Sequence, residues 1–286
     1  MSRKIVVSLS GGKDSTAVLL KGLEMGYPID HAVFFDSSWE FPQMLEHIDL
    51  LERRTGVRIV QLKPKMTLKE MAFEHPVKAS RAALGRLDHE ALQDKFVMMR
   101  DNGWVSGEIP ATRERLIDAM AGKIHRIGYG WPSVFRRWCT RTKVEVGINA
   151  YYRQLKDDFV CWIGFAADEK HRTERPTIHR SNYEKAFPLV EWGMTEADAL
   201  KYCLDRGYDW GGLYDVFDRV SCFCCPLQRL SEVRKLRKHF PKLWKQMLDW
   251  EAEYEANWPG MNRGFRDYDT VHDLEKRFAK EDANNE

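Results

Sequence analysis

The sequence lacks any apolar run long enough to cross a membrane, and it contains no internal repeat or low-complexity tract. Its 45 basic side chains nearly balance its 43 acidic ones, so the net charge of +2 gives no global indication of nucleic-acid binding. Six cysteines among 286 residues are too few for a disulfide scaffold. The chain runs directly into a predicted strand rather than a targeting segment, so we expect a cytoplasmic protein.

The densest motif lies near the start of the sequence, between an apolar run and an amphipathic stretch. Residues 8–15 read Ser-Leu-Ser-Gly-Gly-Lys-Asp-Ser. They follow residues 5–7, whose β-branched side chains suit a buried parallel strand. The apolar spacing of residues 17–23 then predicts a helix packed on a sheet. The motif therefore occupies a strand–turn–helix setting.

The residue types in this turn favour a phosphate site. Gly11 and Gly12 let the backbone approach a ligand, and the N-terminus of the new helix presents free N–H groups and a positive dipole end. Lys13 adds a mobile point charge, and Asp14 can help to hold a magnesium ion that bridges phosphates. For the glycine pair alone, an ordinary tight turn is the alternative. The motif is not a Walker loop, whose first glycine lies further from its Gly-Lys pair.

Further strands and helices predict a doubly wound α/β fold. Residues 31–35 and 57–62 read as strands around an amphipathic helix over about residues 42–55, and residues 159–164 read as a later buried strand. This order is typical of a mostly parallel, Rossmann-like sheet, here followed by a helical C-terminal part. Asp36 follows the second strand at the edge where such sheets bind ligands, although a turn or a helix cap uses the same residue type.

The periodicity weakens over residues 63–127, which predicts a peripheral and mostly helical insertion. We expect an α/β nucleotide-binding domain over residues 1–205 that includes this insertion, and a cysteine-containing, mainly helical region over residues 206–286. Within the first domain, Thr195 is expected to cap a helix that ends at Gly207.

Two later polar segments contain candidates for phosphate or substrate contacts. Arg137 and Lys143 belong to a basic run that predicts either an anion site or a solvated helix face. Glu169 and Arg172 follow the last predicted strand, beyond its carboxyl end. We therefore expect these side chains to lie near a bound nucleotide.

Three cysteines are clustered at Cys222, Cys224 and Cys225. The spacing of Cys222 and Cys225 lets both sulfurs face one metal, and thiolates suit zinc or the irons of an iron–sulfur cluster. Further ligands must come from elsewhere, with Cys224 and the distant Cys139 as candidates, and a redox pair is the alternative. The two remaining cysteines lie in apolar stretches and are expected to be buried, at Cys161 and Cys203.

Residues 10–15 resemble the PP-loop of the ATP pyrophosphatases, and later motifs resemble the phosphoadenosine phosphosulfate reductase-like branch of that superfamily. The later motifs are Asp36 with Glu40, Arg137-Trp138-Cys139-Thr140 with Lys143, residues 164–172, Phe187-Pro188-Leu189 with Trp192, Tyr214, Arg219, and residues 222–226. The resemblance implies that ATP is bound by Ser8, Ser10, Gly11, Gly12, Lys13, Asp14, Ser15 and Asp36, with Lys13, Asp14 and Ser15 as catalytic residues. It also implies a [4Fe-4S] cluster on Cys139, Cys222 and Cys225, with Cys224 as a further candidate and zinc as the alternative metal.

Departures from the family pattern favour ATP-dependent activation over reduction. Residues 164–166 read Gly-Phe-Ala where the family commonly has Gly-Ile-Arg, so one arginine contact is missing, and Ser221 stands where glycine is preferred. Sulfonucleotide reductases use a cysteine in a C-terminal Glu-Cys-Gly motif and usually lack the loop lysine. This sequence has Lys13 and no cysteine after Cys225.

In layout the sequence is most similar to the ATP-pyrophosphatase subunits of DNA phosphorothioation systems. The resemblance implies adenylation of an oxygen of the DNA backbone with loss of pyrophosphate, after which sulfur displaces AMP. The implied partners are a cysteine desulfurase that supplies persulfide sulfur, other phosphorothioation subunits and DNA, with a homodimer as an open option and no membrane contact. Transfer-RNA thiolation, sulfonucleotide reduction with thioredoxin, and a non-enzymatic nucleotide-sensing or scaffold role remain alternatives.

Overall fold

The computed structural model describes residues 3–155, 158–175, 178, 181, 183–266 and 268–284. The chain divides into two compact units, each assembled from two separate stretches of sequence. Unit 1 contains Met1–Lys65 and Cys139–Pro241, and unit 2 contains Met66–Trp138 and Lys242–Glu286. None of the helices in the described ranges combines the length and apolar character that a bilayer crossing needs.

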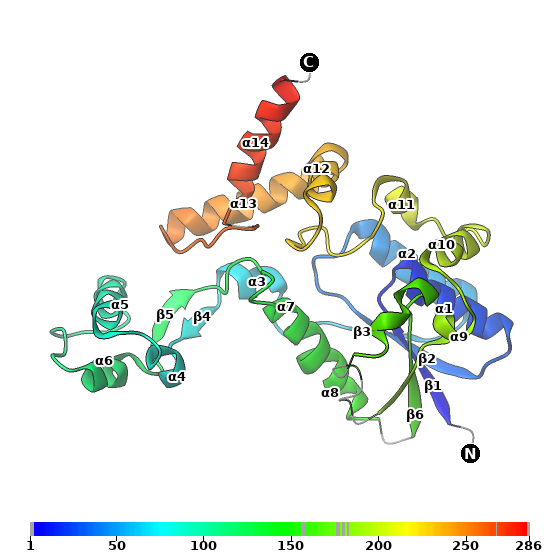
Figure 1. The fold of residues 1–286 in the computed structure, drawn as a ribbon, viewed down its shortest axis with the longest axis horizontal. Helices are drawn as coiled ribbons and strands as arrows, with labels where there is room; N and C mark the ends of the chain where they lie inside the picture. The colour runs from blue at the N-terminus through cyan, green and yellow to red at the C-terminus, as the bar shows by residue number, and fades with distance from the viewer. Residues whose placement is uncertain are drawn as a thin grey trace. The chain divides into compact units, whose positions relative to one another are not determined.

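Unit 1 is built around a five-stranded sheet in the order β3-β2-β1-β6-β7, so β1 lies at its centre, between β2 and β6 (Figure 1 labels β1, β2, β3 and β6). The strands are β1 Lys4–Leu9, β2 Ile29–Phe35, β3 Ile59–Leu62, β6 Phe159–Ile163 and β7 Glu184–Ala186. All four neighbouring pairs are parallel, and Val6 in β1 aligns with His31 on one side and Cys161 on the other. The chain order switches direction at β1, so the crevice beyond the carboxyl end of this strand is the expected ligand position.

Helices of unit 1 pack against this sheet. The helices of unit 1 are α1 Lys13–Glu24, α2 Pro42–Thr55, α8 Asn149–Tyr152, α9 Pro188–Glu191, α10 Glu196–Leu204, α11 Leu213–Val216 and α12 Leu230–His239, with a π-helix η1 Thr142–Ile148 and 3-10 helices η2 Ala167–Arg172 and η4 Trp210–Gly212. Two more helices span the boundaries between the units, α7 Trp138–Arg141 and α13 Pro241–Asn257. Helix α1 packs on α9 and α10, and its Val18 and Leu19 are fully buried, as is Val7 of the central strand. Apolar burial of this kind fixes the turn between β1 and α1.

The predicted α/β class, the parallel sheet and the helical C-terminal part are confirmed. Helix α2 has the predicted bounds. Helix α10 begins with a reciprocal capping box between Thr195 and Asp198, and Gly207 follows it with a φ of +74°. Strand β7 was not predicted, because its three residues lie at the edge of the sheet and carry no alternating pattern.

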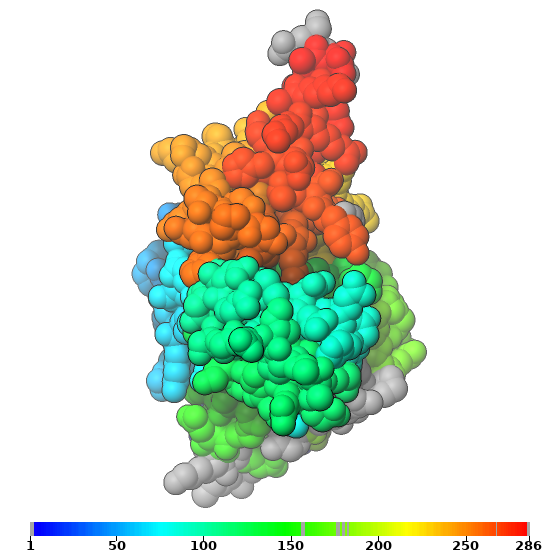
Figure 2. All heavy atoms as spheres, turned by 90° about the vertical axis from the view of Figure 1, so that its left-hand side faces the viewer, coloured from blue at the N-terminus to red at the C-terminus, as the bar shows by residue number. Residues whose placement is uncertain are grey.

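Unit 2 combines a helical cluster with a small antiparallel pair of strands. Its elements are α3 Leu68–Phe73, β4 Pro76–Lys78, α4 Arg81–Leu84, α5 His89–Asp101, α6 Arg113–Met120, β5 Ile124–Ile127 and α14 Val271–Ala283. The C-terminal stretch packs on the earlier one through Tyr254, whose hydroxyl donates to the carbonyl oxygen of Ile127 at 2.6 Å. In Figure 2 this stretch, drawn in orange, lies directly against the cyan and green residues of the earlier stretch.

The insertion predicted over residues 63–127 contains helices α3 to α6, as expected, together with the β4–β5 pair, which was not expected. These strands have three and four residues, and β4 begins at Pro76, so no periodic signal marks them. Compactness alone does not show which parts of the chain fold or act separately. The predicted boundary between residues 205 and 206 therefore stays a prediction.

Candidate functional site

A cavity of about 330 Å³ lies beyond the carboxyl end of β1 in unit 1. Its wall combines the turn after β1 with the residues that follow β6, and it includes Lys143, Glu196 and Tyr214. A larger hollow of about 500 Å³ lies at the opposite, amino ends of the strands, near Arg3 and Phe159. Because open parallel sheets bind ligands beyond their carboxyl ends, we take the smaller cavity as the candidate site.

Packing requires glycine at one point of the turn between β1 and α1 and at one point of the segment after β6. Gly11 in the turn has a φ of +82°, and a Cβ there would lie 2.3 Å from the Sδ atom of Met44. Gly164, after β6, comes so close to α1 that a Cβ would lie 2.7 Å from the backbone nitrogen of Ser15. The predicted close approach of the turn to a ligand stays a prediction.

The hydroxyl of Ser15 makes two hydrogen bonds to the backbone of the turn. Its Oγ accepts a hydrogen bond from the backbone N–H of Ser10 at 3.1 Å and donates to the carbonyl oxygen of Gly12 at 3.1 Å. Gly12 is the N-cap of α1, and its lack of a capping side chain leaves the helix N-terminus open to a ligand. Ser8, Ser10, Gly12, Lys13, Asp14 and Ser15 all line the cavity.

The buried side chain of Trp210 fixes the turn through a hydrogen bond. The indole Nε1 of Trp210 donates to the carbonyl oxygen of Gly11 at 2.7 Å, and the ring of His47 stacks on that indole at 4.6 Å. His47 Nε2 in turn lies 3.0 Å from the hydroxyl of Thr16 in α1. Burial lowers the pKa of His47 to about 3, so this ring is neutral and acts as a packing and hydrogen-bonding group.

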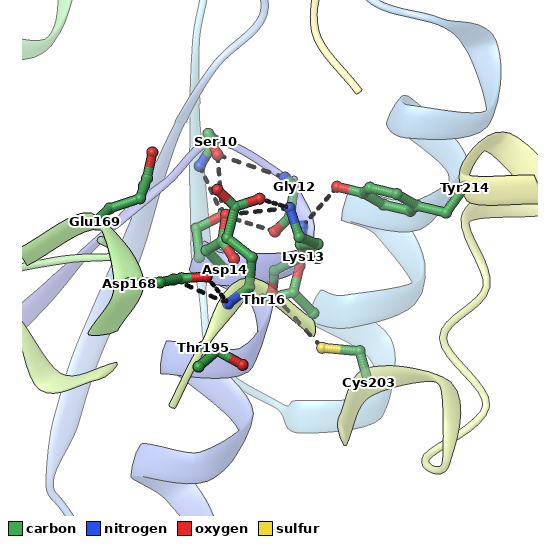
Figure 3. A network of polar contacts seen from close by, with 12 residues as sticks. Ser10, Gly12, Lys13, Asp14, Thr16, Asp168, Glu169, Thr195, Cys203 and Tyr214 are labelled. Carbon is green, nitrogen blue, oxygen red and sulfur yellow. Dashed lines mark hydrogen bonds and ion pairs between the residues drawn. The ribbon is translucent and has the colours of Figure 1, made fainter. Parts of the chain in front are cut away.

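Lys13 is already engaged on both its backbone and its side chain (Figure 3). Its Nζ lies 2.5 Å from an oxygen of Glu196 at the start of α10, and its backbone N–H donates to the hydroxyl of Tyr214 at 2.9 Å. The side chain of Lys13 is only 6% exposed, whereas that of Glu196 is 39% exposed. An anion that reaches Lys13 must therefore exchange places with a carboxylate and a phenol.

Asp14 carries the opposite charge on the same wall. Its Oδ1 is buried and has no hydrogen-bond partner among the residues that the structure describes. Burial raises the pKa of Asp14 to about 6, the nearby carboxylates Glu196 and Glu169 add to this, and Lys13 opposes it. An unbonded carboxylate oxygen on a cavity wall is the donor that Mg²⁺ prefers, so this residue fits the predicted magnesium ligand.

Glu169 and Arg172 both line the cavity and bind each other. The Nη1 of Arg172 donates to both carboxylate oxygens of Glu169, at 2.6 and 2.7 Å, and its guanidinium lies 4.1 Å from the ring centre of Phe165. Lys143 reaches the same cavity from η1. The structure thus brings together three of the four side chains predicted to contact phosphate or substrate.

Two predicted residues lie elsewhere. Asp36 is outside the cavity wall, where its Oδ1 accepts from the backbone N–H of Ser38 at 2.8 Å and its Oδ2 lies 3.2 Å from the Nζ of Lys63. This is the turn geometry that was the alternative for Asp36, and its role in ATP binding stays a prediction. Arg137 belongs to unit 2, and its contact with a nucleotide also stays a prediction.

The four cysteines predicted as metal ligands have different surroundings. Cys222 lines the cavity, with its Sγ 3.4 Å from the hydroxyl of Ser37 and 3.6 Å from a carboxylate oxygen of Glu40. Cys224 is completely buried, whereas Cys139 and Cys225 are partly exposed. Burial raises the pKa of both Cys222 and Cys224.

These thiols do not form a ligand set as they are placed. Within the described part of the chain, no group of three or more His, Cys, Asp or Glu side chains is arranged to hold a metal ion. The arrangement therefore does not fit a cluster or zinc ion, and ligation by these four cysteines stays a prediction. Cys161 and Cys203 are buried, as expected, and burial raises the pKa of Cys203 to about 12.

Glu196 and Trp210 are the site residues that the sequence reasoning missed. Thr195 was recognised as a helix cap, but nothing in the local pattern assigns the next residue, Glu196, to Lys13. Tyr214 and Arg219 were part of the family resemblance without an assigned role, and both line the cavity. Their contacts depend on packing between distant segments.

Comparison with known proteins identifies relatives of this sequence. The profile of the phosphoadenosine phosphosulfate reductase domain matches residues 4–95. The uncharacterized protein MJ0066 of Methanocaldococcus jannaschii is 26% identical over 262 residues, covering 89% of this chain and 42% of that protein. The uncharacterized protein MJ0973 of the same organism is 24% identical over 147 residues, covering 48% of this chain and 34% of that protein. The matches thus span about two fifths and one third of the length of these relatives.

Two solved structures are weakly similar to the chain. The U34-tRNA thiolase NcsA from Methanococcus maripaludis, solved with its [4Fe-4S] cluster, has a TM-score of 0.37 and 14% identity, with 97% of this chain and 73% of that chain covered. A predicted subunit of tRNA methyltransferase from Methanocaldococcus jannaschii has a TM-score of 0.31 and 13% identity, with coverage of 84% and 89%. Likenesses of this size carry no argument about activity. The match to the phosphoadenosine phosphosulfate reductase domain covers residues 4–95, which include the turn after β1 and the strands β2 and β3.

Proposed function

We propose that the protein is an ATP pyrophosphatase that transfers AMP to an oxygen of the DNA backbone, which prepares that position for sulfur. The observation that carries this proposal is the buried Lys13 at the N-terminus of α1 on the wall of the 330 Å³ cavity. A nearly buried ammonium at the N-terminus of a helix favours a polyphosphate. The match of residues 4–95 to the phosphoadenosine phosphosulfate reductase domain supports a nucleotide as the source of that polyphosphate.

Binding would proceed by exchange of partners at the turn. Phosphate oxygens would replace the Glu196 carboxylate on Lys13 Nζ and the Tyr214 hydroxyl on the backbone N–H of Lys13. At Lys13 Nζ one charge-assisted bond replaces another, and at the backbone N–H a charge-assisted bond replaces a neutral one. Tyr214 and Glu196 thereby satisfy the donors of Lys13 when no nucleotide is bound.

The reaction needs an oxygen nucleophile at the α-phosphorus and a stabilised leaving group. As the acceptor oxygen bonds to the α-phosphorus, the bond from that phosphorus to the α–β bridging oxygen breaks, and its electron pair leaves with pyrophosphate. Lys13 and the backbone N–H groups at the start of α1 would stabilise the charge that develops on the departing group. Magnesium held by Asp14 would neutralise phosphate charge when bound.

DNA as the acceptor rests on the resemblance in layout to the subunits of DNA phosphorothioation systems, whereas sulfur as the later nucleophile has support from the site. Cys222 lies on the cavity wall, which supports sulfur delivery from a cysteine desulfurase to this position. We assign no step to an iron–sulfur cluster, because the four cysteines are not arranged to hold one.

The test follows ATP labelled at the α-phosphate, with duplex DNA, transfer RNA or no acceptor added. We expect AMP and pyrophosphate rather than ADP and phosphate, with the fastest release in the presence of DNA. Lys13→Ala should lower the rate about 10²- to 10³-fold, the usual cost of losing one preorganised charge donor. Lys201→Ala is the matched control, because Lys201 is an exposed lysine of α10 paired with Asp205.

Four results decide the outcome of this experiment. ADP and phosphate as products, or an unchanged rate in Lys13→Ala, would contradict the pyrophosphatase reaction. Stimulation by transfer RNA instead of DNA would reassign the acceptor and leave the reaction intact. Tight ATP binding without any turnover would favour a nucleotide-sensing or scaffold role.

A further inference from the structure

Unit 2 buries a guanidinium, two of whose donor atoms no described residue bonds. Arg126, in the short strand β5, is only 8% exposed, and its Nε and Nη2 atoms are buried without hydrogen-bond partners in the described part of the chain. By contrast, the buried carboxylate of Glu251 accepts hydrogen bonds from Trp131 Nε1 at 3.0 Å and from the backbone N–H of His272 at 3.1 Å. In unit 2 the buried carboxylate of Glu251 therefore has hydrogen-bond donors, whereas two donor atoms of the buried Arg126 guanidinium have no acceptor among the described residues.

The loop that follows β5 brings a second guanidinium to the same place. Gly130 lies so close to Arg126 that a Cβ there would be 3.4 Å from the Nη2 atom. The Nη1 of Arg136 donates to the carbonyl oxygen of Tyr129, the residue next to Gly130, at 3.2 Å. Tyr129 thus accepts a hydrogen bond from Arg136, and its neighbour Gly130 lies close to Arg126.

Further cations surround this pair. Burial and the charge of Arg126 lower the pKa of Arg136, and burial, Arg126 and Arg136 lower the pKa of Arg263. The same positive field reaches Lys95 and His125, whose Nζ and Nδ1 atoms lie 3.0 Å apart, and burial together with Lys95 lowers the pKa of His125 to about 4. These shifts show that the cations repel one another.

No carboxylate among the described residues forms an ion pair with Arg126, Arg136 or Arg263. Burial of an unpaired charge is unfavourable, and burial close to like charges increases the cost. A guanidinium presents donors in a fixed planar fork that matches the oxygens of a phosphate. An anion bound among these arginines would satisfy the open donors and cancel the repulsion at once.

We propose that Arg126 and Arg136 form a phosphate-binding site in unit 2, additional to the candidate phosphate site of unit 1. The chemical class of its ligand is a phosphate group, either as a free anion or as part of a nucleic-acid strand. The proposal does not depend on ATP turnover, because none of its residues belongs to the cavity of unit 1.

A protruding aromatic residue makes a strand a testable source of the phosphate. Phe135 directly precedes Arg136 and is 96% exposed, in a turn closed by hydrogen bonds between the backbones of Ser133 and Arg136 at 3.1 and 3.2 Å. An exposed ring next to phosphate-binding arginines is the arrangement on which unpaired bases stack. Binding of a free phosphate ion would not require this ring.

The first experiment measures binding of inorganic phosphate by calorimetry, at constant ionic strength with chloride as the competing anion. The Lys13→Ala protein is used so that the loop of unit 1 contributes little. Arg126→Gln and Arg136→Gln should each weaken binding about tenfold or more, the value expected for a lost charge-assisted hydrogen bond. Arg115→Gln, an exposed arginine of α6 in the same unit, is the matched control and should stay within about twofold.

The second experiment identifies the source of the phosphate. A fluorescent single-stranded oligonucleotide is titrated in place of phosphate, and Phe135→Ala is added to the variants. Tighter binding than phosphate, together with weakening by Phe135→Ala, assigns the site to a strand. If the oligonucleotide binds no more tightly than phosphate, and Phe135→Ala does not change its affinity, the site is assigned to a free phosphate.

The proposal fails if neither probe binds, or if binding is unchanged in both Arg126→Gln and Arg136→Gln. Circular dichroism confirms that each variant is folded. Should Arg126→Gln not fold, Arg136→Gln carries the test, since Arg136 is only partly buried. Arg126→Lys keeps the charge but removes the fork, and should bind with intermediate affinity.

Discussion

Asp14 in unit 1 and Arg126 in unit 2 both bury polar atoms that no described residue bonds, but their surroundings have opposite signs. Asp14 lies beside Lys13, with 3.8 Å between its Oδ2 and the Nζ atom, on the wall of a formed cavity. Arg126 lies near further cations, among them Arg136 and His125. The sign of each unbonded charge indicates what is missing: a cation at Asp14 and an anion at Arg126.

The two regions also differ in how a ligand would enter. At the phosphate loop, Glu196 and Tyr214 already occupy the donors of Lys13, so binding exchanges one set of partners for another. At the arginines, an anion would fill open donors without displacing a carboxylate. We therefore expect the loop to keep its shape when empty, whereas the arginine site gains its stability from the ligand.

The largest expected effect comes from distorting the turn between β1 and α1, which we expect to keep its shape without a ligand. Gly11→Ala should lower the free energy of unfolding by about 2–4 kcal/mol, because a Cβ at a φ of +82° is strained and collides with Met44. Gly26→Ala is the control, since Gly26 has a φ of +76° but no atom within 4 Å of the added Cβ, and it should lose only about 1–2 kcal/mol. Urea unfolding followed by near-ultraviolet circular dichroism measures both. Equal losses in the two variants would show that the loop yields to the added methyl group.

A smaller effect tests whether Asp14 is an uncompensated charge. Its folded-state pKa of about 6 lies above the ordinary value of 3.8, so the folded protein holds this proton more tightly than the unfolded chain. The stabilisation from that proton is fully present below the ordinary value and is lost as pH rises through the folded value. Asp14→Asn should therefore raise the free energy of unfolding by about 1–3 kcal/mol at neutral pH, without magnesium, and by much less in acid.

Urea unfolding at both pH values, with Asp205→Asn as the exposed control, measures this difference. Asp205 is paired with Lys201 on the surface of α10 and should show little change at either pH. A loss of stability in Asp14→Asn at neutral pH would mean that Lys13 compensates the carboxylate. That result would remove the contrast with Arg126.

The smallest expected effect concerns the exchange of partners at Lys13. Glu196→Gln should tighten ATP binding about two- to fivefold, because the nucleotide no longer competes with a carboxylate whose attraction is screened by solvent. Equilibrium titration with a fluorescent ATP analogue measures the change, again with Asp205→Asn as control. Weaker binding in Glu196→Gln would show instead that the carboxylate holds Lys13 in position for the nucleotide.

The parts of the fold and site that follow local rules could be predicted from the sequence. The glycines, the lysine and the helix start at residues 8–15 are contiguous, and alternation of strands and helices leads to a parallel sheet with its ligand edge at β1. Burial of Cys161 and Cys203 follows equally from their apolar neighbours. Local composition was sufficient in each of these cases.

Contacts between distant segments could not be predicted. Glu196 and Tyr214 reach Lys13 across 183 and 201 residues, and no periodicity encodes either pairing. Arg126 reads as one of many basic residues until the packing of unit 2 buries it. The turn at Asp36 shows the same limit, because one residue type serves both as a ligand and as a turn former.

The hydrogen bond from Trp210 to the carbonyl oxygen of Gly11 joins residues 199 positions apart. During synthesis, the first turn of the chain therefore leaves the ribosome long before the indole that fixes it. A nascent chain that ends before Trp210 and Tyr214 lacks both contacts, so the turn between β1 and α1 reaches its full set of contacts only after these residues have been made. Truncations that remove this segment should consequently destabilise the turn at Gly11.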